Sequence, residues 1–251
     1  MKPISIVLVT WYRQQITKMC LDAIIQNTKP SNYRLIVIDN GSPEKMKRML
    51  SDYHDLGLIH ELVLNNSNRG LEPARNQGLE LVNGKYFVCA DNDCLVQKIK
   101  NGKDWLEKLV DLMEKHLDYG AISCRTQVMI GSGNIFDKRE SGEIVDFPHP
   151  GGSFRIMRTN WVKAIGGWRE EVGGRGTEER YICGRLNEQG HKTAFAVQVR
   201  CLHLFGDKNT DRWGYDKDWT PENSGHSDIA HPALDKGDDP KEIKEYLNAN
   251  K

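Results

Sequence analysis

Apolar and polar positions follow two different periods along the first hundred residues. Continuous apolar runs, rich in β-branched residues, are typical of parallel strands that are buried on both faces. The segments between these runs carry apolar residues at helical spacing, which predicts amphipathic helices. Strands are expected over 4–10, 33–38, 58–64 and 85–90, and helical apolar stripes over 16–24, 46–53 and 71–82. This regular alternation predicts a parallel sheet with right-handed crossovers.

Turn residues interrupt the pattern and set the expected helix ends. Ser42 and Pro43 predict an N-cap followed by proline at the first helical position. The segment 131–152 is rich in Gly, Ser, Asp, Lys and Pro, which predicts an irregular connection in front of the site. In the second hundred residues, helices are expected over 105–117, 159–165 and 178–189, and strands over 121–124, 153–157 and 194–204.

A length of 251 residues suits one large α/β domain or two small ones, and we expect a single domain with an appended tail. The domain is expected to cover 1–204, with halves 1–100 and 101–204. Beyond Phe205 the sequence becomes polar and mixes Trp, Tyr and His with many Asp and Lys. Residues 205–251 therefore predict either a partly ordered surface extension or a lid over the acceptor side of the site.

The charge balance excludes some classes of partner. Lys+Arg and Asp+Glu both number 35, so no net field attracts nucleic acid or an anionic membrane. No apolar stretch is long enough for an integral membrane segment, and the N-terminal residues lead into a strand instead of a signal peptide. We therefore expect a soluble, cytoplasmic protein. Its scattered cysteines, without a Cys-x-x-Cys pair, are expected to be reduced residues of the core.

The most informative polar motif is Asp91-Asn92-Asp93, at the carboxyl end of the apolar run 86–90. Open α/β sheets bind ligands at this end of their strands. Two carboxylates one residue apart can share a divalent cation, and that cation can hold a diphosphate. The same pattern is common in turns, because Asp and Asn satisfy backbone groups locally. Taken alone, the motif leaves both interpretations open.

Three further motifs accompany Asp-x-Asp along the chain. They are Val-Ile-Asp-Asn-Gly-Ser at 37–42, Asn-Arg-Gly-Leu-Glu-Pro-Ala-Arg-Asn-Gln-Gly at 68–78, and Glu178-Glu179 heading a helix with Arg185-Leu186. Together, in this order and spacing, the four motifs resemble family 2 glycosyltransferases over residues 4–203. The resemblance implies the GT-A fold, an α/β architecture with a Rossmann-like, mostly parallel central sheet and helices on both faces.

The same resemblance implies a metal-dependent inverting glycosyltransferase. Such an enzyme moves a sugar from a nucleotide diphosphate, here expected to be UDP, to a hydroxyl of a glycan or another acceptor. A retaining transferase on the same fold is one alternative, because 152–154 and 166–169 are similar to segments of retaining polypeptide sugar transferases. A non-catalytic domain that binds nucleotide sugars is the other. The sequence identifies neither the sugar, the acceptor nor the oligomeric state.

The resemblance assigns the nucleotide to residues at the strand ends and on the third helix. Asp39 can accept from the uracil N–H with Thr10 and Tyr12 lining the same pocket, or it can cap the turn at 39–42. Arg75 can donate to nucleotide oxygens, or form an ion pair with Asp91 or Asp39. The expected nucleotide-binding residues are Thr10, Tyr12, Asp39, Arg75, Asp91 and Asn92.

The metal is assigned to the Asp-x-Asp motif and to the last strand. By resemblance, Asp93 ligates the cation directly, and Asp91 binds the ribose or a metal-bound water. Hard oxygen ligands of this kind suit Mg²⁺ or Mn²⁺. His203 matches a histidine that completes the metal shell in the family, although a lone histidine in an apolar strand can also be a core residue. A nitrogen ligand would favour Mn²⁺ over Mg²⁺.

The catalytic role falls on the acidic pair. Glu179 stands where the family has an aspartate as catalytic base, and glutamate can also act as a general base within reach of the hydroxyl. Its extra methylene leaves open an exchange of roles with Glu178, and both can instead be acids favoured at a helix start. Trp168 and Gly152 are expected on the sugar and acceptor side, although Trp168 can equally be a core or hinge residue.

Overall fold

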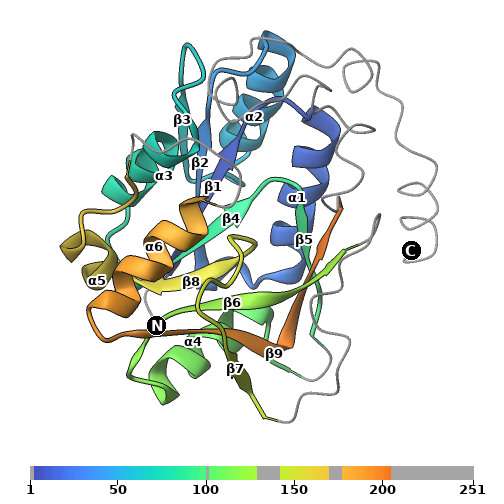
Figure 1. The fold of residues 1–251 in the computed structure, drawn as a ribbon. Coiled ribbons are helices and arrows are strands. Elements are labelled where there is room, and N and C mark those ends of the chain that lie inside the picture. The colour runs from blue at the N-terminus through green and yellow to red at the C-terminus, as the bar shows by residue number, and fades with distance from the viewer. Residues whose placement is uncertain (1–2, 100–101, 129–141, 170–176, 205–251) are drawn as a thin grey trace.

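The computed structural model describes residues 3–99, 102–128, 142–169 and 177–204 (Figure 1). The strands are β1 (Ile4–Thr10), β2 (Tyr33–Asp39), β3 (Glu61–Leu64), β4 (Tyr86–Asp91), β5 (Cys94–Val96), β6 (Tyr119–Val128), β7 (Ile144–Asp146), β8 (Arg155–Arg158) and β9 (Lys192–His203). They form one sheet in the order β3-β2-β1-β4-β8-β6-β9-β5, and β7 pairs with β9. Two segments of the sequence lie outside the described residues: the glycine-rich stretch 173–176, which we expect to be a loop leading to the helix predicted over 178–189, and the predicted extension 205–251.

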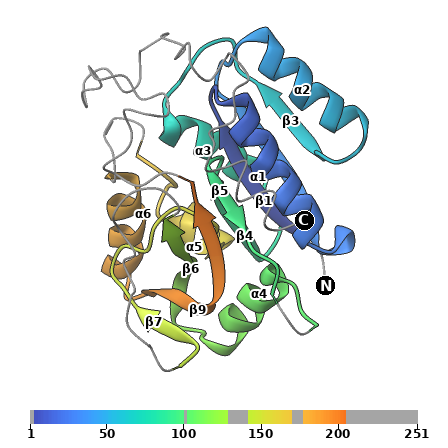
Figure 2. The same cartoon turned by 90° about the vertical axis from the view of Figure 1, so that its right-hand side faces the viewer.

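Helices cover both faces of this sheet. They are α1 (Gln14–Asn27), α2 (Glu44–Asp55), α3 (Leu71–Glu80), α4 (Trp105–Lys115), α5 (Thr159–Ala164) and α6 (Thr177–Glu188), with a short 3₁₀ helix at Pro30–Asn32. In Figure 2, α1 and α2 lie to the right of the sheet and α6 to the left. Among the residues that the structure describes, no helix has the length and apolar character needed to cross a membrane.

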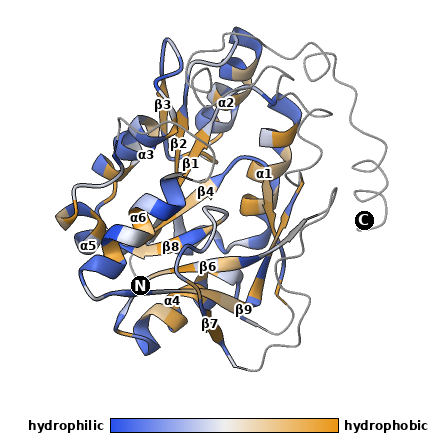
Figure 3. Ribbon diagram, in the orientation of Figure 1, coloured by the Kyte–Doolittle hydropathy of each residue, from blue (hydrophilic) through white to orange (hydrophobic). Residues whose placement is uncertain are grey.

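Two hydrophobic cores follow from the alternation of side chains along β1. Ile6 and Leu8 pack into a core with α1, α2 and α4, whereas Val7 and Val9 pack into a second core with α3, α5 and α6. The parallel strands β1, β2 and β4 are accordingly apolar along most of their length, as their largely orange colour in Figure 3 shows. This arrangement confirms the expected α/β sheet with helices on both faces.

The first half of the sheet agrees with the sequence pattern. β1 pairs in parallel with β2 and β4, and β2 pairs in parallel with β3. The bounds of β1 are those expected, and α1, α2 and α3 lie where the apolar stripes predicted helices. Local periodicity was sufficient here, because each strand is followed by its own crossover helix.

The second half of the sheet is mixed. β8 runs antiparallel to both of its neighbours, β4 and β6, while β6 and β9 are parallel. β5 was not expected, since three residues directly after Asp-x-Asp give no periodic signal, and it pairs antiparallel with the end of β9. β7 lies inside the segment 131–152 that was predicted to be irregular. Because β4 and β8 are neighbours, the sheet continues across the predicted halves 1–100 and 101–204, and this division stays a prediction.

The predicted cap of α2 is wrong. Pro43, not Ser42, is the N-cap residue, and no side chain caps this helix. The Ser42 hydroxyl instead accepts a hydrogen bond from the backbone N–H of Tyr12 at 2.9 Å, and so joins the loops that follow β1 and β2. The prediction for the cysteines is confirmed, because all six are free and buried.

Gly78 sets the approach of α3 to the sheet. A Cβ at this position would overlap Cγ1 of Val7 on β1. We expect Gly78→Ala to lower the free energy of unfolding by about 1–3 kcal/mol, as overpacked cores do, when measured by urea denaturation. Gly184→Ala on α6 is the control, because a Cβ there meets nothing within 4 Å. Equal stability of the two variants would contradict close packing at Gly78.

Candidate active site

The site is built at the carboxyl ends of three parallel strands. Thr10 ends β1 opposite Asp39 on β2, and Val9 pairs with Asp91 at the end of β4. Parallel pairing brings these ends to one edge of the sheet, where open α/β sheets bind ligands. The structure therefore brings together the strand-end residues that the motifs singled out.

Asp39 is fixed by its neighbours at this edge. Its Oδ1 accepts from the Thr10 hydroxyl at 3.2 Å, and its Oδ2 accepts from the Ser42 N–H at 3.0 Å. Burial raises the pKa of Asp39, against these hydrogen bonds. The carboxylate thus makes the turn contact that was the alternative for it, and each oxygen keeps a second lone pair for a ligand.

A network of side-chain amides holds the loop that leads into α3. Asn40 donates to Asn68 Oδ1 at 2.7 Å and to the Gly70 carbonyl at 3.0 Å, while Asn65 donates to Gln77 Oε1 at 2.8 Å. Sequence reasoning gave no role to these side chains. The repeated Asn in 65–70, next to Asn40, was the signal, because Asn satisfies the backbone of turns.

Arg75 is buried at the centre of a charged cluster. Its Nη2 donates to Asp91 Oδ1 at 2.7 Å, and its Nη1 forms an ion pair with Glu178 Oε2. The predicted alternative of an Arg75–Asp91 ion pair is therefore what the structure contains. Arg155 lies on the other side of Glu178, with Nη2 3.2 Å from Oε2. Arg155 was missed, although a charged residue inside the predicted apolar strand 153–157 was a signal.

Gly152 lies against this cluster. A Cβ here would be 2.8 Å from Glu178 Oε1, 2.9 Å from Arg75 Nη2 and 3.2 Å from Asp91 Oδ2. Trp168 is only 2% exposed, and its indole N–H donates to Glu178 Oε2 at 2.9 Å. Its placement agrees with the core alternative, because the ring packs in the second core and its polar atom orients the Glu178 carboxylate.

The two adjacent glutamates have opposite environments. Burial acts to raise the pKa of Glu178, but Arg75 and Arg155 lower it to about 2. Burial, and then the negative charge of Glu178, raises the pKa of Glu179 to about 6. Among the described residues, the buried Oε2 of Glu179 has no hydrogen-bond partner. Glu178 is thus charged at neutral pH and held by two arginines, whereas Glu179 can take up and release a proton near pH 6.

Asp93 and His203 form the second part of the site. His203 Nε2 lies 3.4 Å from Asp93 Oδ1, and one ligand atom each from Asp93, Cys94 and His203 lie within 4.8 Å of one another. Burial would lower the pKa of His203, but Asp93 raises it to about 9. Once His203 has lost its proton, its imidazole nitrogen and the converging carboxylate oxygen of Asp93 fit a divalent cation such as Mn²⁺.

The other members of the motif face elsewhere. Asp91 is directed to Arg75, and Asn92 donates to the Thr17 hydroxyl at 2.9 Å. The side chain of Asn92 therefore joins the motif to α1. Asp93 also accepts from Arg13, whose Nη1 is 2.9 Å from Oδ2. Arg13 is a further residue that sequence reasoning missed.

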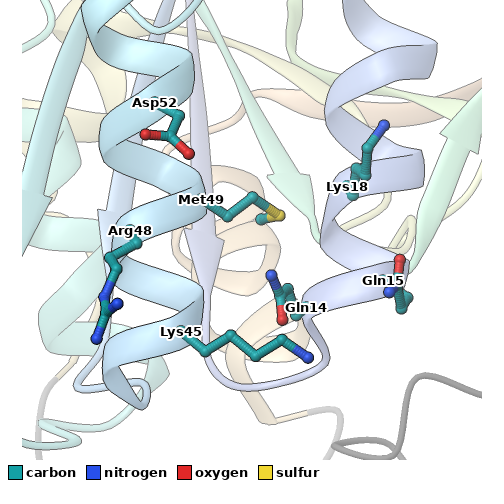
Figure 4. Close-up of a pocket in the computed structure, with 7 residues that line it drawn as sticks. All are labelled: Gln14, Gln15, Lys18, Lys45, Arg48, Met49 and Asp52. Carbon is teal, nitrogen blue, oxygen red and sulfur yellow. The ribbon is translucent and has the colours of Figure 1, made fainter.

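Two cavities of the described structure lie away from this cluster. One of ≈ 510 Å³ lies between α1 and α2 (Figure 4). A second, of ≈ 630 Å³, is lined by residues at the end of α1 and before α4. The predicted site residues line neither of them. The first is lined by Gln14, Gln15, Lys18, Lys45, Arg48, Met49 and Asp52.

A family model described as glycosyl transferase family 2 matches residues 5–168. The chain belongs to glycosyl transferase family 2. Its curated relatives include glycosyltransferase GlyA of Streptococcus pneumoniae, which is 24% identical over 222 residues, or 80% of this chain and 29% of GlyA. Glycosyltransferase AglE of Haloferax volcanii is 26% identical over 106 residues, or 42% of this chain and 33% of AglE. The chain thus spans about a third of the length of these two relatives.

Solved structures share the fold of this family 2 chain. GalNAc-T7, solved with UDP, GalNAc and Mn²⁺, superimposes with a TM-score of 0.69 at 18% identity, over 82% of this chain and 44% of that one. The mannosyltransferase PcManGT of Pyrobaculum calidifontis was solved with GDP-Man and Mn²⁺. It superimposes with a TM-score of 0.64 at 17% identity, over 98% of this chain and 68% of that one. The likeness confirms the expected GT-A fold.

Glu178 is expected to be a stability determinant of the family 2 domain. Glu178→Gln leaves Arg75 and Arg155 with one buried counter-ion fewer, and breaking such a pair typically costs about 3–5 kcal/mol. Urea unfolding at neutral pH measures this loss. Glu188→Gln is the control on the same helix, because Glu188 is exposed and pairs only with Arg185 among the described residues.

The pH dependence of unfolding tests the same assignment. The pKa of Glu178 is lowered from an ordinary 4.5 to about 2, so its contribution is complete above 4.5 and is lost as the pH falls towards 2. The stability difference between wild type and Glu178→Gln should therefore shrink over that range. A difference that is constant with pH would contradict the ion-paired state of Glu178.

Proposed function

We propose that the chain is a metal-dependent inverting glycosyltransferase that moves a sugar from a UDP-sugar to a hydroxyl of a glycan or another acceptor. One observation carries the proposal. A carboxylate–imidazole pair suited to a divalent cation and a glutamate with a pKa near 6 lie at the same edge of a GT-A sheet. Transfer of this kind needs a charge to neutralise the departing diphosphate and a base to deprotonate the acceptor.

The donor end of the site is proposed to use the strand-end residues. Asp39 would accept from the base N–H, beside Thr10 and Tyr12. Arg75 would hold the Asp91 carboxylate in place for the ribose, since their side chains are 2.7 Å apart. Solved neighbours hold UDP in one case and GDP-Man in another, so these folds accept more than one nucleotide. We choose UDP because the motif at 37–42 resembles the family's uracil-binding strand end.

Asp93 and His203 would hold the cation, Mn²⁺ or Mg²⁺. When bound, it would neutralise charge on the diphosphate leaving group. Neighbouring structures solved with Mn²⁺ support this assignment. The convergence of Asp93 and His203 on one point supports it independently, because an oxygen and a nitrogen donor 3.4 Å apart can serve one ion.

Glu179 would be the catalytic base. Its carboxylate would take the proton of the acceptor hydroxyl as that oxygen attacks the anomeric carbon, while the bond from that carbon to the diphosphate oxygen breaks on the opposite face. Glu178 suits this role less, because its carboxylate already accepts from Arg75, Arg155 and Trp168. Gly152 would let the backbone on the sugar and acceptor side approach the cluster closely, because a Cβ at this position would collide with Glu178 and Arg75.

Calorimetry and product analysis test the proposal together. UDP and GDP are titrated with Mn²⁺ and in excess EDTA, and a panel of UDP- and GDP-sugars is screened for slow hydrolysis or transfer. Metal-dependent binding of UDP with turnover of a UDP-sugar is the expected result. NMR of the product anomer separates inversion from retention. Tight UDP binding without turnover of any donor would favour the non-catalytic alternative.

A further inference from the structure

Arg13 forms an ion pair with the carboxylate of Asp93, which is proposed to hold the cation. Its Nη1 lies 2.9 Å from Asp93 Oδ2, and the exposed fractions of the two side chains are 7% and 12%. His203 faces the other oxygen of the same carboxylate at 3.4 Å. Asp93 therefore lies between two side chains that can each carry a positive charge.

A divalent cation on Asp93 would compete with Arg13. It would lie within a few ångströms of a guanidinium that is always charged, and like charges repel strongly where water is excluded. The Asp93 oxygens would also have to serve both the ion and the guanidinium. Arg13 therefore disfavours the ion as long as it stays on Asp93.

The backbone at Arg13 is unusual and is held in place. Tyr12 and Arg13 have φ values of 53° and 55°, in the left-handed region that residues other than glycine rarely adopt. Strained residues of this kind cluster at functional sites. The Arg13 carbonyl accepts from the Thr17 N–H at 2.9 Å, and Asn92 donates to the Thr17 hydroxyl at 2.9 Å.

These contacts join the first turn of α1 to the Asp-x-Asp motif. The main chain of Arg13 and the motif are thereby held as one unit, and the long side chain of Arg13 is the part that can change partner. A guanidinium matches phosphate oxygens as well as it matches a carboxylate, because it donates in a planar fork to both. A donor diphosphate at this edge of the sheet offers such oxygens.

We propose that Arg13 couples metal binding to donor binding. It neutralises Asp93 until a nucleoside diphosphate enters, then donates to the diphosphate and leaves Asp93 and His203 to the cation. This inference rests on the proposed function and adds a residue and an order of events to it. By linkage, the donor must strengthen cation binding by the same factor by which the cation strengthens donor binding.

The test compares binding constants of the full chain by calorimetry, with Mn²⁺ binding also followed by electron paramagnetic resonance. Arg13→Met removes the charge and keeps an unbranched, apolar stem. With Mn²⁺ alone, this variant is expected to bind the ion about tenfold more tightly, because a buried like charge is removed. With saturating Mn²⁺, its affinity for UDP is expected to fall about tenfold, as one charge-assisted hydrogen bond is lost.

Two further variants are controls for the changes in Mn²⁺ and UDP affinity. Arg13→Lys keeps the charge and should resemble the wild type in Mn²⁺ binding more than Arg13→Met does. Arg34→Met removes an arginine at the amino-terminal end of β2, where it pairs with Glu61 at 2.5 Å, and should change neither constant. Thermal unfolding of each variant shows whether its fold is retained.

Unchanged or weaker Mn²⁺ binding by Arg13→Met, with no donor present, would overturn the inference. So would a wild-type chain whose Mn²⁺ affinity is the same with and without UDP, and that measurement needs no variant to fold. A wild type that binds neither UDP nor GDP in Mn²⁺ refutes the proposed function instead. The Mn²⁺ affinities of wild type and Arg13→Met, compared without nucleotide, still decide whether Arg13 and the ion compete.

Discussion

Replacing Asp93 by alanine is expected to abolish the Mn²⁺ dependence of UDP binding and to lower sugar transfer at least about a thousandfold. Asp93 contributes the carboxylate that meets His203 and Cys94 in the candidate metal group. A metal at a leaving diphosphate supplies several kcal/mol of charge stabilisation, and each 1.4 kcal/mol is about tenfold in rate. Initial rates at saturating Mn²⁺ and donor measure the loss.

Controls separate the metal role from stability. Asp118→Ala removes an exposed aspartate that pairs with Lys192 at 2.9 Å, and it should leave rate and UDP affinity unchanged. His203→Ala should weaken Mn²⁺ binding less than Asp93→Ala does, because the negatively charged ligand stays. Asp93→Ala also removes the partner of Arg13, so its thermal unfolding must be compared with wild type. Equal UDP affinity of the wild type in Mn²⁺ and in EDTA would refute the metal assignment.

The parts of the fold that were predicted correctly depend on local periodicity. Every residue of β1 is buried, so the two ends of the apolar run from Ile4 to Thr10 are also the ends of the strand. β8 has only four residues and runs against its neighbours, and its direction depends on where a long preceding segment returns to the sheet. Hydrophobic patterns report burial and period but not the direction of pairing, so this half of the topology was not accessible from the sequence.

The candidate site was predictable where a motif supplies both residue type and position. Asp91, Asp93 and Arg75 belong to such motifs, and they meet at one edge because parallel strands end together. Arg13 and Arg155 carry no motif. The role of each depends on the distant carboxylate that it contacts, 80 residues away for Arg13 and 23 for Arg155.

The buried side chains of Arg75 and Arg155 give Glu178 and Glu179 different roles. From the sequence, Glu179 matched the catalytic base of the family, but an exchange of roles with Glu178 stayed open. The structure makes them different, because both arginines converge on Glu178 and hold it ionised. The fixed negative charge of Glu178 then acts on its neighbour, as in other sites where one carboxylate raises the pKa of a second.

Glu179→Gln is expected to lower sugar transfer by about 10²–10⁴-fold, the usual contribution of a general base, while UDP affinity stays nearly unchanged. The substitution keeps the shape of the side chain and removes its ability to accept a proton. Because the pKa of Glu179 is about 6, the wild-type rate should fall as the pH drops below 6, where the carboxylate becomes protonated. The variant should lack this acid limb.

Glu178→Gln completes the comparison, because it should reduce stability and keep an acid limb in whatever folded fraction remains active. That limb should lie at a lower pH than in the wild type, since the negative charge of Glu178 no longer raises the pKa of Glu179. Rates are compared per folded protein, with UDP affinity measured on the same samples. A Glu179→Gln variant that transfers sugar at the wild-type rate would exclude Glu179 as the base. Loss of the acid limb in Glu178→Gln alone would move the role to its neighbour. The buried ion pairs of Glu178 argue against that outcome, since a carboxylate held by two guanidinium groups is a poor proton acceptor.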